Sequence, residues 1–121
     1  MNHILKKYCP RIEFDSYEDF FENFKIDVPE AFNFGFDVVD EWARVDPEKR
    51  ALVWCDDRDE ERTFTFDDLS KLSNRAPTRF ASSGIGKGDV VMMILRRRWE
   101  YWVCAVALCK LGATIIPASL Q

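Results

Sequence analysis

Residues 84–117, GIGKGDVVMMILRRRWEYWVCAVALCKLGATIIP, constrain the fold more than any other stretch of this sequence. Residues 89–95 form a short apolar run, which is typical of a strand buried on both faces. Residues 98–111 have no polar face beyond their first turn and predict a largely buried helix, for which Gly112 suits a left-handed C-terminal cap. Residues 113–118 are a second β-branched run. This strand-helix-strand pattern predicts a right-handed parallel crossover, so the expected fold class is α/β.

Two helices are expected before this unit. Residues 16–24 predict a short amphipathic helix capped by Ser16, whose phenylalanines pack on the main body. Residues 36–44 predict a second helix, and its acidic side chains are expected on a solvated face: Asp37, Asp40 and Glu41. We therefore expect an N-terminal helical arm over residues 1–31 and a first α/β segment over residues 32–121.

A hairpin and a third helix connect these parts. Residues 51–55 and 62–66 read as short strands separated by a charged turn, which predicts a β-hairpin on the margin of a partial parallel sheet. Asp67 is the expected cap of a helix that ends near residues 83–84. Pro77 cannot donate a hydrogen bond to the preceding turn, so we expect a kink there.

Charge and cysteine spacing limit the kinds of function. Residues 13–61 carry 17 acidic and 5 basic side chains, whereas residues 62–121 carry 9 basic and 4 acidic ones. A net charge of −4 argues against a general nucleic-acid binder. The four cysteines lack paired spacing and there is one histidine, so we expect no metal site and reduced thiols. No targeting segment or membrane span is visible, which favours a cytoplasmic protein.

Two places could hold an anion. The glycines at 84, 86 and 88 follow a helix and precede a strand, which favours a tight connection over a phosphate-binding loop. The carboxyl ends of the two parallel strands are better placed, since open α/β sheets bind ligands there. Residues 96–98 are three arginines at one such end; they either lie in solvent and pair with the acidic half, or one of them, Arg97, meets a ligand phosphate.

The segments RTFTFDDLSKLSNRA, GIGKGDVV, WEYW and KLGATIIPASLQ together resemble the opening part of AMP-forming acyl-CoA synthetases, most closely the medium-chain, butyrate-type members. The resemblance runs from about Phe32 to Gln121, and it departs from the family pattern at Pro77-Thr78, Ser83 and Ser119. It implies the N-terminal part of the large domain of these enzymes.

The resemblance implies a two-step reaction. A short- or medium-chain carboxylic acid and ATP, with magnesium, give an acyl-adenylate, which coenzyme A converts to a thioester. The family's catalytic segments lie later than this chain reaches, so we expect it to be inactive alone, with no catalytic residue and no cofactor bound by itself. In distant relatives the backbone past the second strand approaches coenzyme A, which implies cofactor contacts at Ser119, Leu120 and Gln121.

A second class of function stays open. The chain could be a free-standing, non-catalytic interaction module that kept this fold. Because the last predicted strand ends just before Gln121, its edge would be exposed to pairing with another copy, which favours a fragment of a longer enzyme or a homo-oligomer over a finished monomer. A dinucleotide-binding domain is excluded by the glycine placement.

Overall fold

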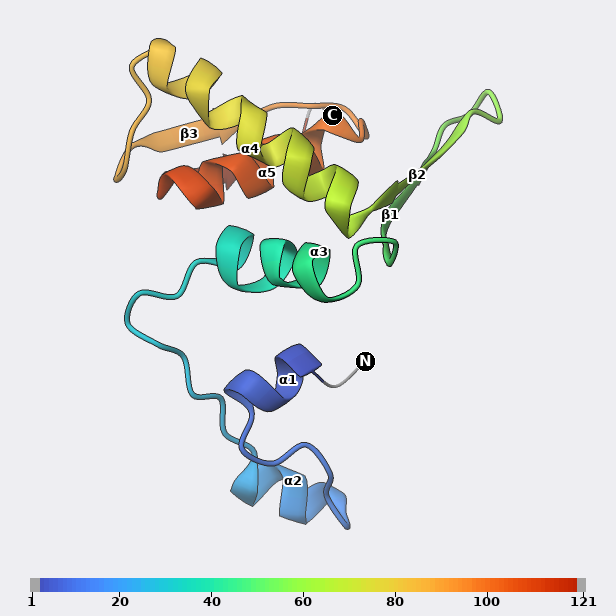
Figure 1. Ribbon diagram of the computed structural model, residues 1–121, viewed down its shortest axis with the longest axis vertical. Coiled ribbons are helices and arrows are strands. Elements are labelled where there is room, and N and C mark those ends of the chain that lie inside the picture. The colour runs from blue at the N-terminus through green and yellow to red at the C-terminus, as the bar shows by residue number, and fades with distance from the viewer. Residues whose placement is uncertain (1–2, 120–121) are drawn as a thin grey trace. The chain divides into compact units, whose positions relative to one another are not determined.

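The computed structural model describes residues 3–119, which belong to two compact units, Met1–Phe32 and Asn33–Gln121 (Figure 1). The first unit holds helices α1 (His3–Tyr8) and α2 (Tyr17–Asn23). The second unit runs from a π-helical segment η1 (Gly35–Asp40) and α3 (Glu41–Val45) through the hairpin β1 (Arg50–Cys55) and β2 (Glu61–Thr65) to α4 (Phe66–Ser82). Strand β3 (Val90–Met93), helix α5 (Glu100–Leu111) and strand β4 (Thr114–Pro117) follow.

The cap of α2 in the first unit is confirmed. The Ser16 hydroxyl oxygen accepts a hydrogen bond from the Asp19 N–H at 3.2 Å. Asp19 in turn accepts hydrogen bonds from the Asp15 N–H and from the Arg11 guanidinium, and these contacts lower the pKa of the Asp19 carboxyl, the Asp15 N–H most. The Phe20 and Phe24 rings stack at 4.8 Å. Their expected packing on the second unit stays a prediction.

The core of the second unit is made by helices from three parts of the sequence. Buried apolar side chains of η1, α4 and α5 meet there: Val39, Leu69, Val103 and Val106. Helix α5 is largely buried as expected, and it ends at Gly112, whose φ of 78° confirms the left-handed cap.

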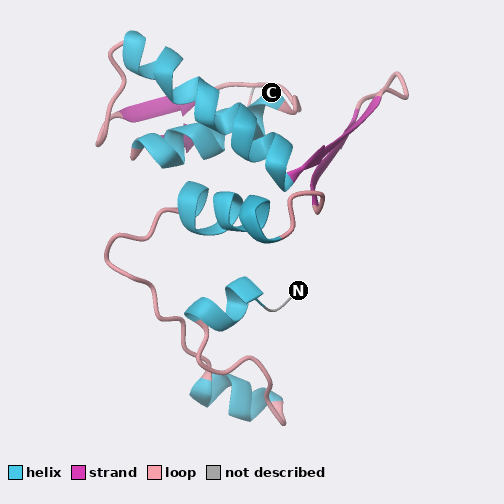
Figure 2. Cartoon of the chain, in the orientation of Figure 1, coloured by secondary structure: helices cyan, strands magenta, loops and turns pink. Residues whose placement is uncertain are grey.

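Strands β3 and β4 pair in parallel, which confirms the strand-helix-strand unit and the α/β class. Strands β1 and β2 pair antiparallel as expected (Figure 2). Within residues 3–119, however, this hairpin forms a two-stranded sheet of its own and is not hydrogen-bonded to the margin of the β3–β4 sheet. The hairpin instead meets the rest of the unit through side-chain contacts, such as the Trp54 indole N–H, which donates to the Arg97 carbonyl.

The expected burial of the first strand on both faces is wrong. Met93 is buried, but Val90 and Met92 on the opposite face are each 61% exposed, and Ile116 beside them on β4 is 43% exposed. The apolar run is real, but in the described residues the elements of this chain cover only one face of the sheet. We call Val90, Met92 and Ile116 the open sheet face.

Helix α4 begins earlier than the sequence suggested. Its cap is Thr65 and not Asp67: the Thr65 hydroxyl oxygen accepts from the Asp68 N–H at 3.1 Å, and the Asp68 carboxylate accepts from the Thr65 N–H at 3.0 Å. This reciprocal pair is a capping box. The helix is continuous through Pro77, and a kink at that residue stays a prediction.

The expected solvated face of the second helix is wrong: the Glu41 side chain is 18% exposed, and the Asp37 carboxylate accepts a part-buried hydrogen bond from the Asn33 N–H. Asp40 does not lie on a solvated face, because its carboxylate accepts hydrogen bonds at 2.6 Å both from the Lys110 ammonium group and from the Ser70 hydroxyl. The Lys110 ammonium group also donates to the Asn74 side-chain carbonyl at 2.8 Å. This network joins η1, α4 and α5.

Candidate functional site

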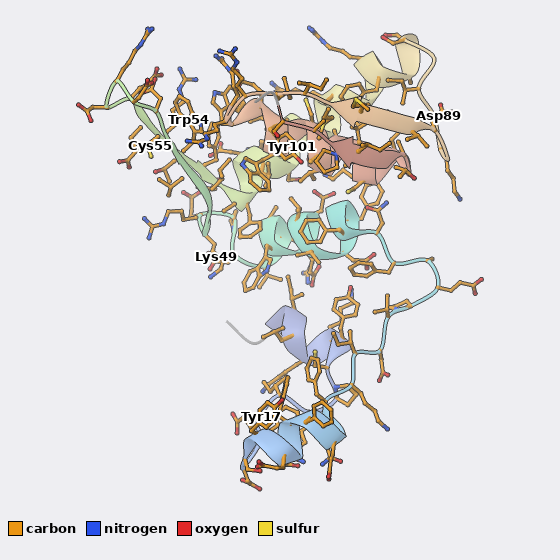
Figure 3. The ribbon with its side chains drawn as sticks, turned by 180° about the vertical axis from the view of Figure 1, so that it is seen from behind. Tyr17, Lys49, Trp54, Cys55, Asp89 and Tyr101 are labelled. Atoms are coloured by element: carbon orange, nitrogen blue, oxygen red, sulfur yellow. The ribbon has the colours of Figure 1, made fainter. Side chains whose placement is uncertain are left out.

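An open cleft of about 1300 Å³ lies at the carboxyl ends of β3 and β4. Its walls come from the outer part of the hairpin, from the arginine segment after β3, and from the residues that follow β4. Figure 3 shows Trp54 and Cys55 of the hairpin at one end of this unit and Asp89, which precedes β3, at the other. Its lining includes Trp54, Arg58, Arg96, Arg97 and Ser119. The cleft therefore lies at the position where open α/β sheets generally bind their ligands.

The hairpin turn that forms one wall is ordered by its own side chains. The Asp56 carboxylate accepts hydrogen bonds from the N–H groups of Arg58 and Glu60 at 2.9 and 3.0 Å, and the Asp56 N–H donates to the Glu60 carbonyl. Asp59 adopts a left-handed φ of 59°, which aspartate tolerates better than most residues. The turn can thus hold Arg58 at the rim of the cleft.

Trp54 ties this wall to the arginine segment. Its indole N–H donates a hydrogen bond of 2.7 Å to the Arg97 carbonyl oxygen. Nearby, the rings of Phe64 and Trp99 lie 5.0 Å apart, and the Arg62 guanidinium lies 5.8 Å from the centre of the Trp99 ring. These contacts join the hairpin to the start of α5 and fix the backbone at Arg97.

On the other wall, the main-chain pairing of the parallel sheet extends one residue past β4. The Ala118 N–H donates to the Met93 carbonyl at 3.0 Å. This bond carries Ser119 past the end of β3, where it lines the cleft with Arg96 and Arg97.

Five arginines line the cleft, and they fall into two groups. Arg62 and Arg98 are neutralised by neighbours, with distances of 2.8 Å to Glu60 and Glu100. The Arg98 hydrogen bonds lower the pKa of Glu100, so this pair is charged at neutral pH. The other group is Arg58, Arg96 and Arg97, which are exposed and whose guanidinium groups make no hydrogen bond or ion pair with the described residues. Three free cations therefore face a cleft in which Asp57 is the free carboxylate.

A smaller hollow of about 420 Å³ adjoins the cleft. It shares Trp54, Arg97 and Arg98 with the cleft and adds Tyr101 and Trp102 from the first turn of α5. The rings of Tyr101 and Trp102 meet edge to face at 5.3 Å. We call this the aromatic hollow.

Two of the four predicted contact residues, Arg97 and Ser119, are thus brought together on one cleft, whereas Leu120 and Gln121 lie outside the described residues. Sequence reasoning missed Trp54 and Arg58. Both are on the hairpin, and no local pattern shows that it folds toward the end of β3.

Other kinds of site have no support in the part of the chain that the structure describes. In residues 3–119 there is no group of three or more histidine, cysteine, aspartate or glutamate side chains that could hold a metal ion. No helix among these residues is long and apolar enough to span a membrane. All four cysteines are free thiols, and burial raises the pKa of Cys104 and Cys109.

Comparison with known proteins identifies the family. The AMP-binding enzyme family matches residues 39–121, so the chain belongs to it. The chain is 34% identical over 114 residues to the mitochondrial acyl-coenzyme A synthetase ACSM3 of Mus musculus, covering 89% of this chain and 20% of that protein. It is also 34% identical over 100 residues to human mitochondrial ACSM5, covering 78% of this chain and 17% of the relative. The resemblance to acyl-CoA synthetases is confirmed.

Solved structures agree with this fold. The N-terminal subdomain of Klebsiella oxytoca NpsA aligns with a TM-score of 0.61 and 25% identity over 69% of this chain and 20% of that one. A fatty acid AMP ligase from Legionella pneumophila aligns with a TM-score of 0.65 over 70% of this chain and 15% of that one, at 19% identity, and shows the fold alone. The chain spans about one fifth of the length of the curated relatives it matches.

Proposed function

We propose that this chain is the N-terminal part of an acid-CoA ligase that activates a short- or medium-chain carboxylic acid. The observation that carries the proposal is the family match over residues 39–121 together with relatives named acyl-coenzyme A synthetases. In the proposed reaction, ATP and the acid give an acyl-adenylate and pyrophosphate, and coenzyme A then displaces AMP to form a thioester.

Within this reaction, the residues of the cleft are suited to binding a substrate that carries phosphate. Arg96, Arg97 and the Ser119 hydroxyl supply donors at one cleft, which suits an anion and not the acyl chain. We assign the catalytic groups and the magnesium ion to the remaining four fifths of the enzyme. The chain alone is therefore expected to be inactive.

Pyrophosphate release tests this proposal. The protein encoded by the complete reading frame should release pyrophosphate from ATP and magnesium when butyrate or a longer acid is added, and it should form the thioester when coenzyme A is present. Residues 1–121 alone should do neither. The DNA after codon 121 provides an independent check, because a continuation should encode a Ser/Thr/Gly-rich loop that ends in lysine.

The alternative is a non-catalytic interaction module, and the exposure of the open sheet face favours it. A stop codon directly after Gln121, with no activity in the purified protein, would support the module and count against the ligase.

The cytoplasm remains our proposed location, although the relatives ACSM3 and ACSM5 are named mitochondrial. A carboxy-terminal fluorescent fusion of the complete protein distinguishes the two compartments.

A further inference from the structure

The aromatic hollow has the composition of a protein-binding surface. Tryptophan, tyrosine and arginine contribute most of the binding energy in protein interfaces, and the hollow is lined by Trp54, Tyr101, Trp102 and Arg97. Its apolar lining is open to solvent, because the Trp102 side chain is 52% exposed. Exposed apolar surface that is bordered by polar groups is typical of interaction sites.

The shape of the hollow is fixed before anything binds. The Trp54 indole N–H donates a hydrogen bond of 2.7 Å to the Arg97 carbonyl oxygen, which holds the indole ring in one orientation. The rings of Tyr101 and Trp102 meet edge to face at 5.3 Å. A preformed pocket loses little conformational entropy when it is filled, and this favours binding.

The charge around the hollow is positive. Arg97 lines it, and Arg58 and Arg96 line the adjoining cleft; the guanidinium groups of all three make no hydrogen bond or ion pair with the described residues. Asp57 is the free carboxylate opposite these three cations. The surface is therefore complementary to an acidic partner.

We propose that the aromatic hollow binds an acidic segment of a partner protein. One large apolar side chain of that segment enters the hollow, and a neighbouring carboxylate pairs with Arg97, since guanidinium groups form bidentate, charge-assisted hydrogen bonds with carboxylates. A volume of about 420 Å³ is near the lower end of the range for small-ligand pockets, so it suits one side chain and not a whole helix. This site does not depend on the proposed ligase activity.

Aromatic rings beside arginines are also found where proteins bind single-stranded nucleic acid. Such sites have a positively charged groove that follows the backbone over several nucleotides, and their binding depends on many phosphate contacts. This chain has a net charge of −4 and three unpaired arginines in the described cleft. The acidic peptide is therefore the favoured occupant.

The test measures the binding of fluorophore-labelled peptides to the 121-residue chain by fluorescence anisotropy under reducing conditions. The peptide EDEFEDE should bind. EDESEDE, which lacks the ring, should bind about tenfold more weakly, and KKKFKKK should not bind. If EDEFEDE fails to bind, or binds no better than EDESEDE, the proposal is overturned. Tighter binding of an eight-nucleotide oligothymidylate would instead identify a site for single-stranded nucleic acid.

Matched variants locate the site. W102A should weaken EDEFEDE about tenfold and leave EDESEDE unchanged, whereas R97A should weaken both peptides and make their binding less sensitive to salt. Val53→Glu is a second test of the hollow in case W102A fails to fold, because its carboxylate would repel the peptide. The controls F21A and R79A remove an exposed ring and an exposed guanidinium elsewhere and should have no effect. Equal effects of W102A and F21A, or of R97A and R79A, would refute the site.

The complete protein separates a partner from the protein's own later part. EDEFEDE should bind the complete protein as it binds the 121-residue chain. If it binds the chain alone, a later segment of the same protein covers the hollow, and the proposal of a partner is wrong. Pyrophosphate release by the same preparation reports separately on the ligase proposal.

Discussion

Lys110 places an ammonium group inside the second unit. Its side chain is 2% exposed, and its Nζ lies 2.6 Å from the Asp40 carboxylate and 2.8 Å from the Asn74 side-chain oxygen. A buried cation is tolerated only when charge and hydrogen bonds compensate its lost hydration. Because Gly35 has no side chain, the Lys110 stem can pass close to it; a Cβ there would lie 2.4 Å from Lys110 Cγ.

Asp40→Ala should therefore lower the free energy of unfolding by about 3 kcal/mol, since it leaves a buried ammonium group without its counter-charge. Urea unfolding followed by tryptophan fluorescence measures this loss, because all four tryptophans belong to the second unit. Lys71→Ala is the control: it removes an exposed pair with Asp67 on α4 and should have a much smaller effect. Equal losses for the two variants would show that the Lys110 pair contributes no more than a surface contact.

The role of Asp40 could not be predicted from its neighbours in sequence. The helix pattern placed it among other acids, which is typical of a solvated face. Its partner Lys110 is 70 residues away, in the last turn of α5, where the helix dipole by itself favours a lysine. A long-range pair of this kind leaves no local pattern, whereas the Gly112 cap and the Ser16 cap depend only on adjacent residues and were predicted correctly.

At the level of elements, the first residues of α4 join the helix directly to the hairpin. The Phe66 N–H donates to the Lys49 carbonyl directly after the Thr65 cap, so the helix begins without a loop. The sequence pattern predicted Asp67 as the cap. Backbone geometry selects Thr65, because its extended φ of −82° and ψ of 170° direct the hydroxyl oxygen to the third helical residue.

Thr65→Ala should cost about 1 kcal/mol of unfolding free energy, because the Asp68 N–H loses its acceptor. Asp67→Ala should cost clearly less, since the Asp67 carboxylate pairs with Lys71 and caps no N–H group in the described residues. Fluorescence-detected urea unfolding of both variants makes the comparison. A larger loss in Asp67→Ala would restore the sequence-based cap.

The sequence pattern predicted where the strands lie but not which of their faces are covered. The runs that became β1 to β4 were all found, because β-branched and aromatic residues between turn signals are a local pattern. Which faces are covered is a tertiary property. The run at β3 is apolar on both faces, as in a fully covered parallel sheet, yet the described residues cover only the face that includes Met93.

At the scale of the whole molecule, the open sheet face is the feature from which we predict the behaviour of the chain in solution. Parallel sheets occur almost only where both faces are covered, and a two-stranded sheet alone is marginal. Val90, Met92 and Ile116 present a contiguous apolar surface across both strands, in register at Met92 and Ile116. Such a surface favours association with another polypeptide, either another segment of a longer enzyme or a second copy of this chain.

For the isolated chain we predict concentration-dependent self-association through this sheet. Light scattering coupled to size-exclusion chromatography should show a molar mass that rises above 14.2 kDa as the loading concentration increases. The double change V90K/M92K should keep the mass at that of one chain, because two ammonium groups on the open face cannot be buried against a second copy. Leu5→Lys, at an exposed position of α1, is the control and should leave association unchanged. A chain that stays monomeric at every concentration, or one whose association survives V90K/M92K, would rule out this face as the contact. If the chain is part of a longer enzyme, as proposed above, the same double change in that longer protein should instead reduce the yield of folded protein, since later segments would cover the open sheet face.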